Sequence, residues 1–226
     1  MKIQNLHSWE VEIEEAREVQ LGLSQWLILE GEPKKLSLIA GADVSYSKED
    51  RRVWGGVVII DIKEWEVIEE RGAYCETAFP YIPGYLSFRE MPVLLKAFEK
   101  VQTIPDVVLL DGQGIAHPRQ MGIASHMGLF LDMPSVGCAK KRFVGESNPV
   151  GREKGSRTPL RLNEKNVGWV LRTREGVRPV FVSPGHRIAL KSAVDVVLKS
   201  CRKYRLPEPL RKAHHLANRL REQEEE

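Results

Sequence analysis

The sequence predicts an α/β protein with one mixed sheet that is flanked by helices on both faces. Three runs of β-branched and aliphatic residues come first, and short polar turns separate them, as in an antiparallel meander. Helical and strand-like segments then alternate, which is typical of strands joined by helical crossovers. No linker or internal repeat divides the chain, so the two patterns predict a single domain over residues 1–226.

The first element is an amphipathic helix predicted over 12–29, where apolar residues recur near helical spacing. Gly31 and Pro33 then end it. Residues 145–165 are polar and contain several Gly and Pro, so we predict a loop there. The other predicted elements, in order, are strands at 37–46, 54–62 and 65–74, a helix at 88–101, a strand that ends at Asp111, a helix at 121–132, strands at 134–139, 167–173 and 179–183, and helices at 187–203 and 207–224.

Composition restricts the class of protein. Hydrophobic residues make up 42% of the chain and charged residues 29%, which fits a soluble globular protein. No apolar run approaches the roughly 18 residues of a membrane helix, and the first residues do not resemble a signal peptide. The three cysteines form no CxxC pair, so we expect neither a disulfide framework nor a zinc site. We therefore expect a cytoplasmic protein without a membrane partner, and a monomer, because nothing in the sequence demands a dimer.

Charge is unevenly distributed along the chain. Residues 139–226 contain 21 Lys and Arg against 10 Asp and Glu, whereas residues 1–138 contain 13 basic and 21 acidic residues. The acidic residues of 1–138 suit cations, and the basic residues of 139–226 suit phosphates. An ordinary solvated basic surface explains the same numbers, so charge alone does not decide between these interpretations.

Two aspartates stand at the ends of apolar strand-like runs. Asp43 follows Leu38–Ala42, and Asp111 follows Val107–Leu110. A carboxylate beside a buried strand is costly unless a cation compensates it, and Asp oxygens are the ligands expected for Mg²⁺. Each Asp by itself is equally well explained as a strand-end or turn cap. Two of them in matching positions favour a metal site.

A third carboxylate and an unusual loop lie between these strands. Ser87 and Glu90 fit the S-x-x-E capping box of a helix start, and the alternative for Glu90 is a ligand of metal or water. Residues 79–85 are too apolar for an ordinary loop, and their two prolines make it stiff. Such a loop either enters a base step as a wedge or packs back on the core.

Other polar residues are weaker candidates on pattern alone. Gly112 permits close approach of a ligand, and His117 and Arg119 are candidates for phosphate contact. Lys140, at a strand end near the aspartates, is a candidate for holding the scissile phosphate, although a basic run is usually just solvated. Adjacent His214 and His215 lie on the last helix, where a histidine is more often structural or exposed than catalytic.

Together these residues resemble the endonuclease V family of DNA repair nucleases. The matching segments occur in family order and span about residues 38–220: GADVSY at 41–46, FPYIPGYLSFRE at 79–90, DGQGIAHPR at 111–119, GIASHMG at 122–128, GCAKKR at 137–142, FVSPGH at 181–186 and KAHHLANRL at 212–220. The resemblance implies a ribonuclease H-like fold and Mg²⁺-dependent hydrolysis, with Mn²⁺ as a possible substitute. It implies cleavage of DNA at the second phosphodiester bond 3′ to deoxyinosine.

The resemblance also assigns roles to residues. Asp43 and Asp111 become the metal ligands, Glu90 positions water, Lys140 holds phosphate and His214 is the histidine of the catalytic site. The wedge that separates the strands is Tyr81, Ile82 and Pro83. An everted base is expected in a pocket near Gly84, Leu86, Gly112 and Ile123, with His117 among the substrate contacts.

Several alternatives stay open at this point. One is another ribonuclease H-like nuclease that cuts RNA hybrids or junctions, or inosine in RNA. A second is a nucleic-acid-binding protein that has lost catalysis, although Asp43, Glu90, Asp111 and Lys140 are all present. The pattern does not decide between one and two metal ions, and the 145–165 loop matches no segment of the family.

Overall fold

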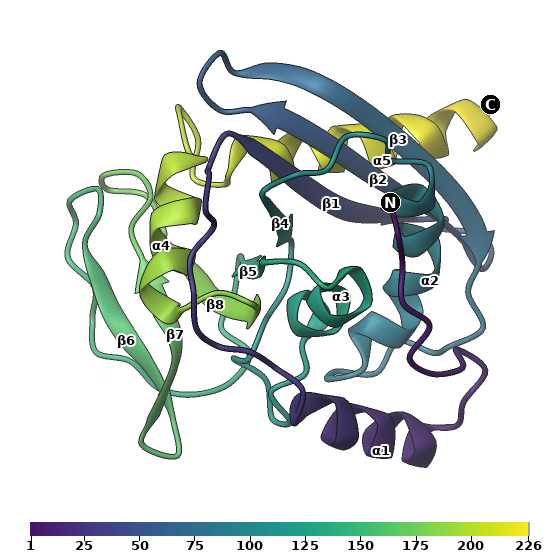
Figure 1. The fold of residues 1–226 in the computed structure, drawn as a ribbon, viewed down its shortest axis with the longest axis horizontal. Coiled ribbons are helices and arrows are strands. Elements are labelled where there is room, and N and C mark those ends of the chain that lie inside the picture. The colour runs from purple at the N-terminus through teal and green to yellow at the C-terminus, as the bar shows by residue number, and fades with distance from the viewer. Residues whose placement is uncertain (226) are drawn as a thin grey trace.

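The computed structural model describes residues 1–225 and is organised around one eight-stranded mixed sheet (Figure 1). The strand order is β3-β2-β1-β4-β5-β8-β7-β6. The strands are β1 Leu38–Tyr46, β2 Arg52–Asp61, β3 Glu66–Glu76, β4 Val107–Leu110, β5 Ser135–Ala139, β6 Arg157–Leu162, β7 Lys165–Leu171 and β8 Val180–His186. The helices are α1 Ile13–Ser24, α2 Leu86–Glu99, α3 Ile123–Leu131, α4 Leu190–Lys199 and α5 Glu208–Glu225.

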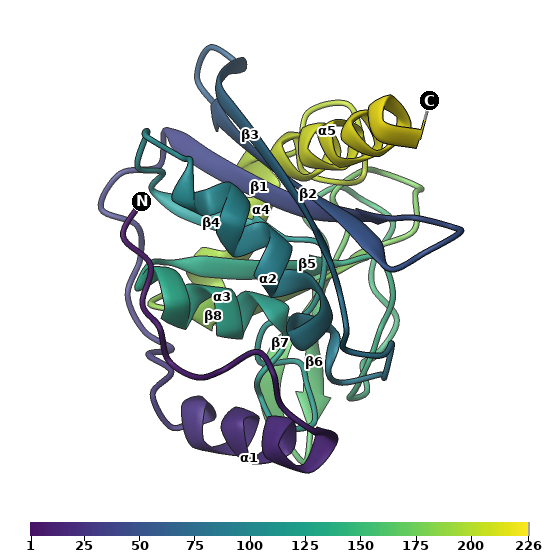
Figure 2. The same cartoon turned by 90° about the vertical axis from the view of Figure 1, so that its right-hand side faces the viewer.

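The topology confirms the predicted mixed sheet. Strands β1, β2 and β3 form the antiparallel meander, whereas β1, β4 and β5 run parallel. The sheet then continues through β8, β7 and β6, with each neighbouring pair antiparallel. Figure 2 shows α5 on one side of the meander and α2 on the other. Helices on both faces explain why the central strands are almost continuously apolar.

Alternating side chains of the central strands supply two separate cores. Ala40, Val108 and Leu110 pack into a cluster with residues of α2 and α3. Ile39 and Leu109 point the other way, into a cluster with residues of α4 and the start of α5. Because successive residues of a strand face opposite sides, each strand contributes to both layers and is held from both faces.

Two glycines let α5 approach the sheet closely. A Cβ on Gly41 would lie 2.2 Å from the backbone of Pro209, and a Cβ on Gly56 would lie 2.9 Å from the carbonyl oxygen of Ala213. Any larger residue would therefore push the helix away from β1 and β2. This packing brings the side chain of His214 to the level of Asp43.

The structure corrects several predicted elements. Strand β6 lies inside the segment predicted as a loop at 145–165; it is an edge strand that contains Pro159 and polar outward-facing residues, so its pattern is weak. The helices predicted at 12–29 and 187–203 are shorter, and Trp26 lies beyond α1 and is exposed. Within residues 1–225, no helix is both long and apolar enough to cross a membrane.

Candidate active site

The five predicted catalytic residues come together at one edge of the sheet. Ala42 of β1 pairs with Leu110 of β4, so Asp43 and Asp111 lie side by side just past this pair. Lys140 follows β5, the next strand of the sheet. Glu90 reaches the edge from α2, and His214 reaches it from α5 on the opposite face. Parallel strands place their carboxyl ends on the same edge, which explains the convergence.

A chain of hydrogen bonds orients His214. Its Nδ1 lies 2.7 Å from Oδ2 of Asp43, and its Nε2 lies 3.0 Å from Nδ2 of Asn218. Ser45 donates to Oδ1 of Asn218 at 2.8 Å, so the amide nitrogen of Asn218 faces the imidazole. Nε2 therefore accepts and Nδ1 donates its proton to Asp43. The bond to Asp43 raises the pKa of His214 despite partial burial.

Asp111 has a cationic partner of its own. The Lys140 ammonium donates to Oδ2 of Asp111, and the Asp111 side chain is 17% exposed. Burial raises the pKa of the Asp111 carboxyl, and the nearby charge of Asp43 raises it further. Partial burial acts to lower the pKa of Lys140, but Asp111 outweighs this effect and the pKa is raised. Lys140 is thus a stable cation beside the carboxylates.

Glu90 does not form the predicted capping box. Helix α2 begins at Leu86 without a side-chain cap, and the Ser87 hydroxyl contacts Nδ1 of His126 at 3.0 Å. Instead, Oε1 of Glu90 accepts a 2.5 Å hydrogen bond from the Tyr46 hydroxyl. Burial raises the pKa of Glu90 to about 8, and the charges of Asp43 and Asp111 contribute in the same direction. The Glu90 carboxyl therefore belongs to the acidic cluster.

This donor set fits a hard divalent cation. Three carboxyl groups from different elements meet here, where burial raises the pKa values of Glu90 and Asp111 and the charge of Asp43 raises both further. Oxygen ligands of this type are those that Mg²⁺ prefers. As the side chains stand, Lys140 and His214 engage Asp111 and Asp43, and no three His, Cys, Asp or Glu residues in 1–225 form a ready-made cage. Cation binding therefore requires small side-chain movements.

A cavity of about 460 Å³ opens beside the carboxylates. All eight residues predicted to contact substrate line it: Tyr81, Ile82, Pro83, Gly84, Leu86, Gly112, His117 and Ile123. Its wall also includes Asp111, Lys140 and Phe143, of which Phe143 had no predicted role. A larger open hollow of about 740 Å³ is lined by 145–148 and 158–164 and contains none of the catalytic candidates. The smaller cavity is therefore the one that adjoins the chemistry.

Residues 79–85, which we call the wedge loop after their predicted role, are anchored at both ends and exposed at the tip. Phe79 and Tyr85 are buried against Phe88, with the rings of Phe79 and Phe88 stacked at 5.4 Å. Tyr81, in contrast, is 70% exposed. The loop therefore packs on the core at its ends, and the wedge stays a prediction for its exposed tip. Only the tip is available to a ligand.

The carbonyl of Gly84 is held by three side chains. It accepts from Nε2 of Gln20 at 3.0 Å and from Nη2 of Arg119 at 2.9 Å, and Nε2 of His117 lies at 2.9 Å. Gln20 also accepts from Nε of Arg119 at 2.6 Å. Gly84 has a φ of +89°, which suits glycine. His117 and Arg119 thus fix this turn of the loop, and their predicted contacts with phosphates stay a prediction.

Gln20 had no predicted role, although its position on the apolar stripe of α1 is unusual for a polar residue. Gln20 is fully buried on α1, on the same helical stripe as buried Ala16 and Leu23. A polar residue on an apolar stripe indicates a specific hydrogen-bond partner. The pattern alone does not identify that partner, which lies 64 residues away.

Replacing Gln20 by alanine is expected to loosen the wedge loop. The change removes the bonds that Nε2 donates to Gly84 and, at 3.2 Å, to the carbonyl of Met121, and it leaves Nε of Arg119 without its acceptor. We therefore expect a loss of about 1–3 kcal/mol in the free energy of unfolding. Limited proteolysis should cut the 79–85 segment faster in the variant. Gln25→Ala, at an exposed position just after the same helix, is the matched control and should change neither quantity. Equal stability of both variants would contradict the anchoring role.

Comparison with known proteins identifies the family. The endonuclease V family model matches residues 22–215. An endonuclease V of Dehalococcoides mccartyi is 48% identical over 220 residues, covering 97% of this chain and 99% of the relative. The endonuclease V crystal structure from Streptomyces avermitilis superposes with a TM-score of 0.92 at 39% identity and 97% coverage of each chain.

A third similar protein was solved with nucleic acid. Ciona intestinalis endonuclease V, in complex with a 23mer DNA containing an inosine followed by a ribo-adenosine, has a TM-score of 0.81. The two sequences are 26% identical, and the match covers 93% of this chain and 97% of the Ciona intestinalis chain. The family match and the relatives extend over almost the whole chain and include the carboxylate edge. The chain therefore belongs to the endonuclease V family and is an endonuclease that acts on phosphodiester bonds.

Proposed function

We propose that this nuclease hydrolyses the second phosphodiester bond 3′ to a deoxyinosine in DNA and leaves 3′-hydroxyl and 5′-phosphate ends. The observation that carries the proposal is the position of the acidic cluster. Asp111 lines a cavity that is large enough for a base and has a protruding aromatic tip at its rim, and Asp43 and Glu90 lie next to Asp111. An enzyme that acts beside a damaged base needs both parts together.

Mg²⁺ is the proposed cofactor, with Asp43 and Asp111 as its ligands and Mn²⁺ as a substitute. When bound, such a cation polarises the phosphate and stabilises charge on the leaving oxygen. Lys140, a persistent cation beside Asp111, is positioned to bind a nonbridging phosphate oxygen. Glu90 lies at the cluster, where its carboxylate form can accept a proton from attacking water. Whether one or two ions act follows from a titration of rate against Mg²⁺ concentration.

His214 has a complementary role in the proposed reaction. Its ring is fixed by Asp43 and Asn218. Its side chain extends from α5 to the carboxylates and is 51% exposed. The raised pKa of His214 increases the share of the protonated form near neutral pH. A protonated imidazole there can stabilise negative charge or donate a proton as the bond breaks.

A cleavage assay on matched oligonucleotides tests the proposed function. The substrates are identical duplexes with deoxyinosine or deoxyadenosine at one position, incubated with Mg²⁺ or with chelator. We expect a single nick at the second bond 3′ to deoxyinosine, only with the metal, and products that a ligase can rejoin. Cleavage at another bond, or equal cleavage of both duplexes, would contradict the proposal.

Inosine in RNA is the second candidate substrate. It is favoured by the Ciona intestinalis relative, whose bound DNA contains a ribo-adenosine directly after the inosine. A 2′-hydroxyl beside the lesion therefore fits in that protein. A substrate series with inosine or deoxyinosine, followed by a ribose or deoxyribose nucleotide, separates the candidates. Faster cleavage of the all-RNA strand than of DNA would favour an inosine-specific ribonuclease.

Replacing Tyr81 by alanine is expected to weaken discrimination for inosine more than general DNA binding. The exposed Tyr81 ring is free to stack on a base, and such stacking contributes about 1–3 kcal/mol. Affinity for the inosine duplex should therefore fall roughly 5- to 150-fold, with little change for undamaged duplex. Binding is compared at one salt concentration in chelator.

Tyr74→Ala is the matched control for this prediction. Tyr74 is 58% exposed but lies on strand β3, away from the cavity. It should bind both duplexes as the wild type does. An equal loss on both duplexes in Tyr81→Ala would show that the tip supplies general affinity and does not read the lesion.

A further inference from the structure

The positive charge of the second part of the chain is concentrated in three segments. Residues 140–142, 150–157 and 172–178 contain nine of the 21 Lys and Arg in 139–226, but only two of the 10 Asp and Glu. The net charge of these short segments is therefore +7. Their exposed basic residues, which we call the basic edge, are Lys140, Lys141, Arg142, Arg152, Lys154, Arg157, Arg174 and Arg178.

Strand register places the three segments at the edge that carries the carboxylates. Ala139 of β5 pairs with Phe181, which pairs with Val170 of β7. One residue further, Val180 pairs with Leu171, which pairs with Arg157. Arg157, the end of β7 and the start of β8 are therefore level with Lys140. The loops beyond them leave the sheet on the side of Asp111.

The two outer loops are bonded to each other. The amide of Gly155 donates to the carbonyl of Arg172 at 2.8 Å, and the amide of Gly176 donates to that of Arg152 at 3.1 Å. The Arg172 guanidinium spans the pair, because it donates to the carbonyls of Gly151 and Val177. Loops that are crosslinked in this way present their charged side chains from a defined platform.

The platform is joined directly to the active site. Nη2 of Arg205 donates to the carbonyl of Lys140 at 2.7 Å and to that of Pro179 at 2.6 Å. Residues 140–142 also line the cavity beside the carboxylates. Basic residues thus extend from the wall of the cavity past the start of β8 and the end of β7 to Arg157 of β6, with Glu153 and Glu175 as the acidic residues among them.

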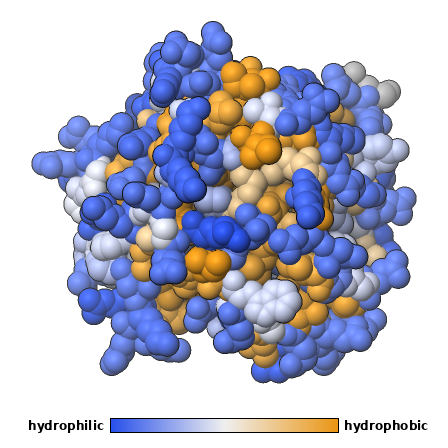
Figure 3. Space-filling model, in the orientation of Figure 1, coloured by the Kyte–Doolittle hydropathy of each residue, from blue (hydrophilic) through white to orange (hydrophobic). Residues whose placement is uncertain are grey.

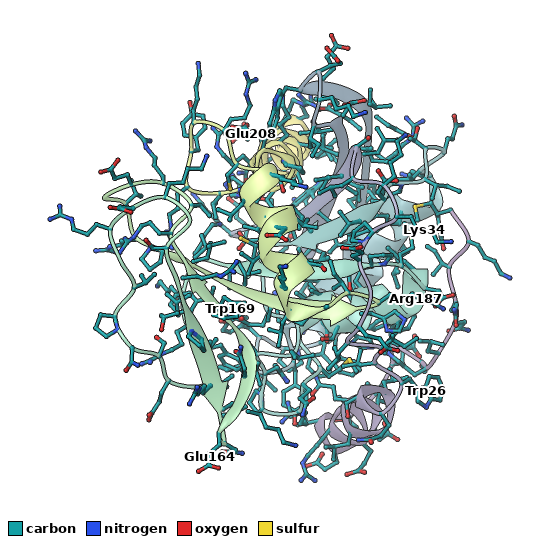
Figure 4. The ribbon with its side chains drawn as sticks, turned by 60° about the vertical axis from the view of Figure 1, so that its left-hand side comes forward. Trp26, Lys34, Glu164, Trp169, Arg187 and Glu208 are labelled. Atoms are coloured by element: carbon teal, nitrogen blue, oxygen red, sulfur yellow. The ribbon has the colours of Figure 1, made fainter. Side chains whose placement is uncertain are left out.

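The outer members of this surface are not neutralised within the protein. Among residues 1–225, Lys140 is the only residue of the basic edge that forms an ion pair. All the other ion pairs of Lys and Arg involve residues outside the basic edge. Figure 4 shows side chains with nitrogen ends spread around the loops on the left, on the opposite side of the molecule from Lys34. In the orientation of Figure 1, the left margin of the molecule, where β6 lies, is mostly hydrophilic (Figure 3).

We propose that the basic edge binds the phosphate backbone of nucleic acid next to the lesion and extends the substrate path beyond the base cavity. The proposal rests on the proposed function, since it takes the carboxylates as the place of cleavage. A row of Lys and Arg at one edge, of which Lys140 alone forms an ion pair within residues 1–225, matches a polyanion, and backbone contacts of this kind do not depend on sequence. It also gives a role to the 145–165 segment.

The test compares two triple variants with equal loss of charge. Arg152→Ser, Lys154→Ser and Arg174→Ser remove exposed members of the basic edge that do not line the cavity. Lys34→Ser, Lys35→Ser and Lys63→Ser remove exposed lysines near the start of β1 and the end of β2, at the opposite edge of the sheet. Binding to a long inosine duplex is measured in chelator over a series of salt concentrations.

The basic-edge variant is expected to bind the long duplex more weakly and with a lower salt dependence. The slope of log K against log salt should fall by about 0.9 for each phosphate contact removed, so the two proteins converge at high salt. The control variant should keep the wild-type slope. On a short inosine strand without duplex flanks, the basic-edge variant should match the wild type in affinity and single-turnover rate.

The results distinguish a failure of the basic-edge proposal from a failure of the proposed function. An unchanged slope in the basic-edge variant, or an equal loss in the control variant, would overturn the basic edge. If the wild type fails to cut inosine substrates, the proposed function fails, yet the slopes in chelator still test the surface. If the triple variant does not fold by circular dichroism, Arg174→Ser alone, with an expected slope change of about 0.9, replaces it.

Discussion

Asp43→Ala or Asp111→Ala is expected to abolish metal-dependent cleavage while the fold is kept. Both carboxylates are at the centre of the acidic cluster, and a bound cation contributes several kcal/mol to the stabilisation of the transition state. Loss of either ligand should therefore lower the single-turnover rate by about 10³-fold or more. The measurement is nicking of a deoxyinosine duplex in saturating Mg²⁺.

Stability provides the control for this prediction. Burial and the charge of Asp43 raise the pKa of Asp111, so its ionised form costs more free energy in the folded protein than in the unfolded chain. Asp111→Ala removes that cost, and the thermal midpoint in chelator should not fall. Mg²⁺ should raise the midpoint of the wild type but not of either variant. Wild-type turnover in either variant would refute the metal assignment.

His214→Ala is expected to slow the chemical step strongly, whereas His215→Ala is not. Only His214 contacts Asp43, at 2.7 Å, and adjacent positions on a helix differ by about 100° in direction. Loss of a group that donates a proton or stabilises charge should lower the rate by about 10²–10⁴-fold, with binding largely kept. Single-turnover rates in saturating Mg²⁺ measure the effect.

Two further variants sharpen this comparison. His215 is also exposed and lies 6.1 Å from His214 between ring centroids, so His215→Ala controls for loss of an imidazole at this surface. Asn218→Ala removes the partner of Nε2 and should cause a smaller loss than His214→Ala. If His215→Ala were the slower enzyme, the assignment of His214 would be wrong.

Most of the fold was predictable because its patterns are strong. The three strands of the meander alternate with clear polar turns, and the central strands are continuously apolar. Strand β6 was not predictable, because an edge strand with one polar face and Pro159 resembles a loop. Helix ends were overestimated for α1, where the apolar Trp26 continues the helical spacing beyond the helix but remains exposed.

The residues of the site were predictable to a different degree. Asp43 and Asp111 stand out because a carboxylate at the end of an apolar strand is costly, and this cost can be read from the local sequence. Glu90 was ambiguous, because the same S-x-x-E spacing serves a capping box and a buried acid. Resemblance to the family favoured the acidic role, and α2 begins at Leu86 without a side-chain cap, while Glu90 accepts a hydrogen bond from Tyr46.

The sequence by itself determined the α/β class, the order of most elements, the two aspartates that follow apolar runs and the family; Asp43 lies within β1, three residues before its end. The tertiary structure alone decided which side chains meet: His214 with Asp43 across 171 residues, and Gln20 with Gly84 across 64. It also decided that the basic loops lie on the side of Asp111. Hydrophobic periodicity, and the cost of a carboxylate beside an apolar run, are properties of residues that are neighbours in sequence. The contacts between distant residues depend instead on strand register and on the close packing of α5, and segments far apart in sequence determine both together.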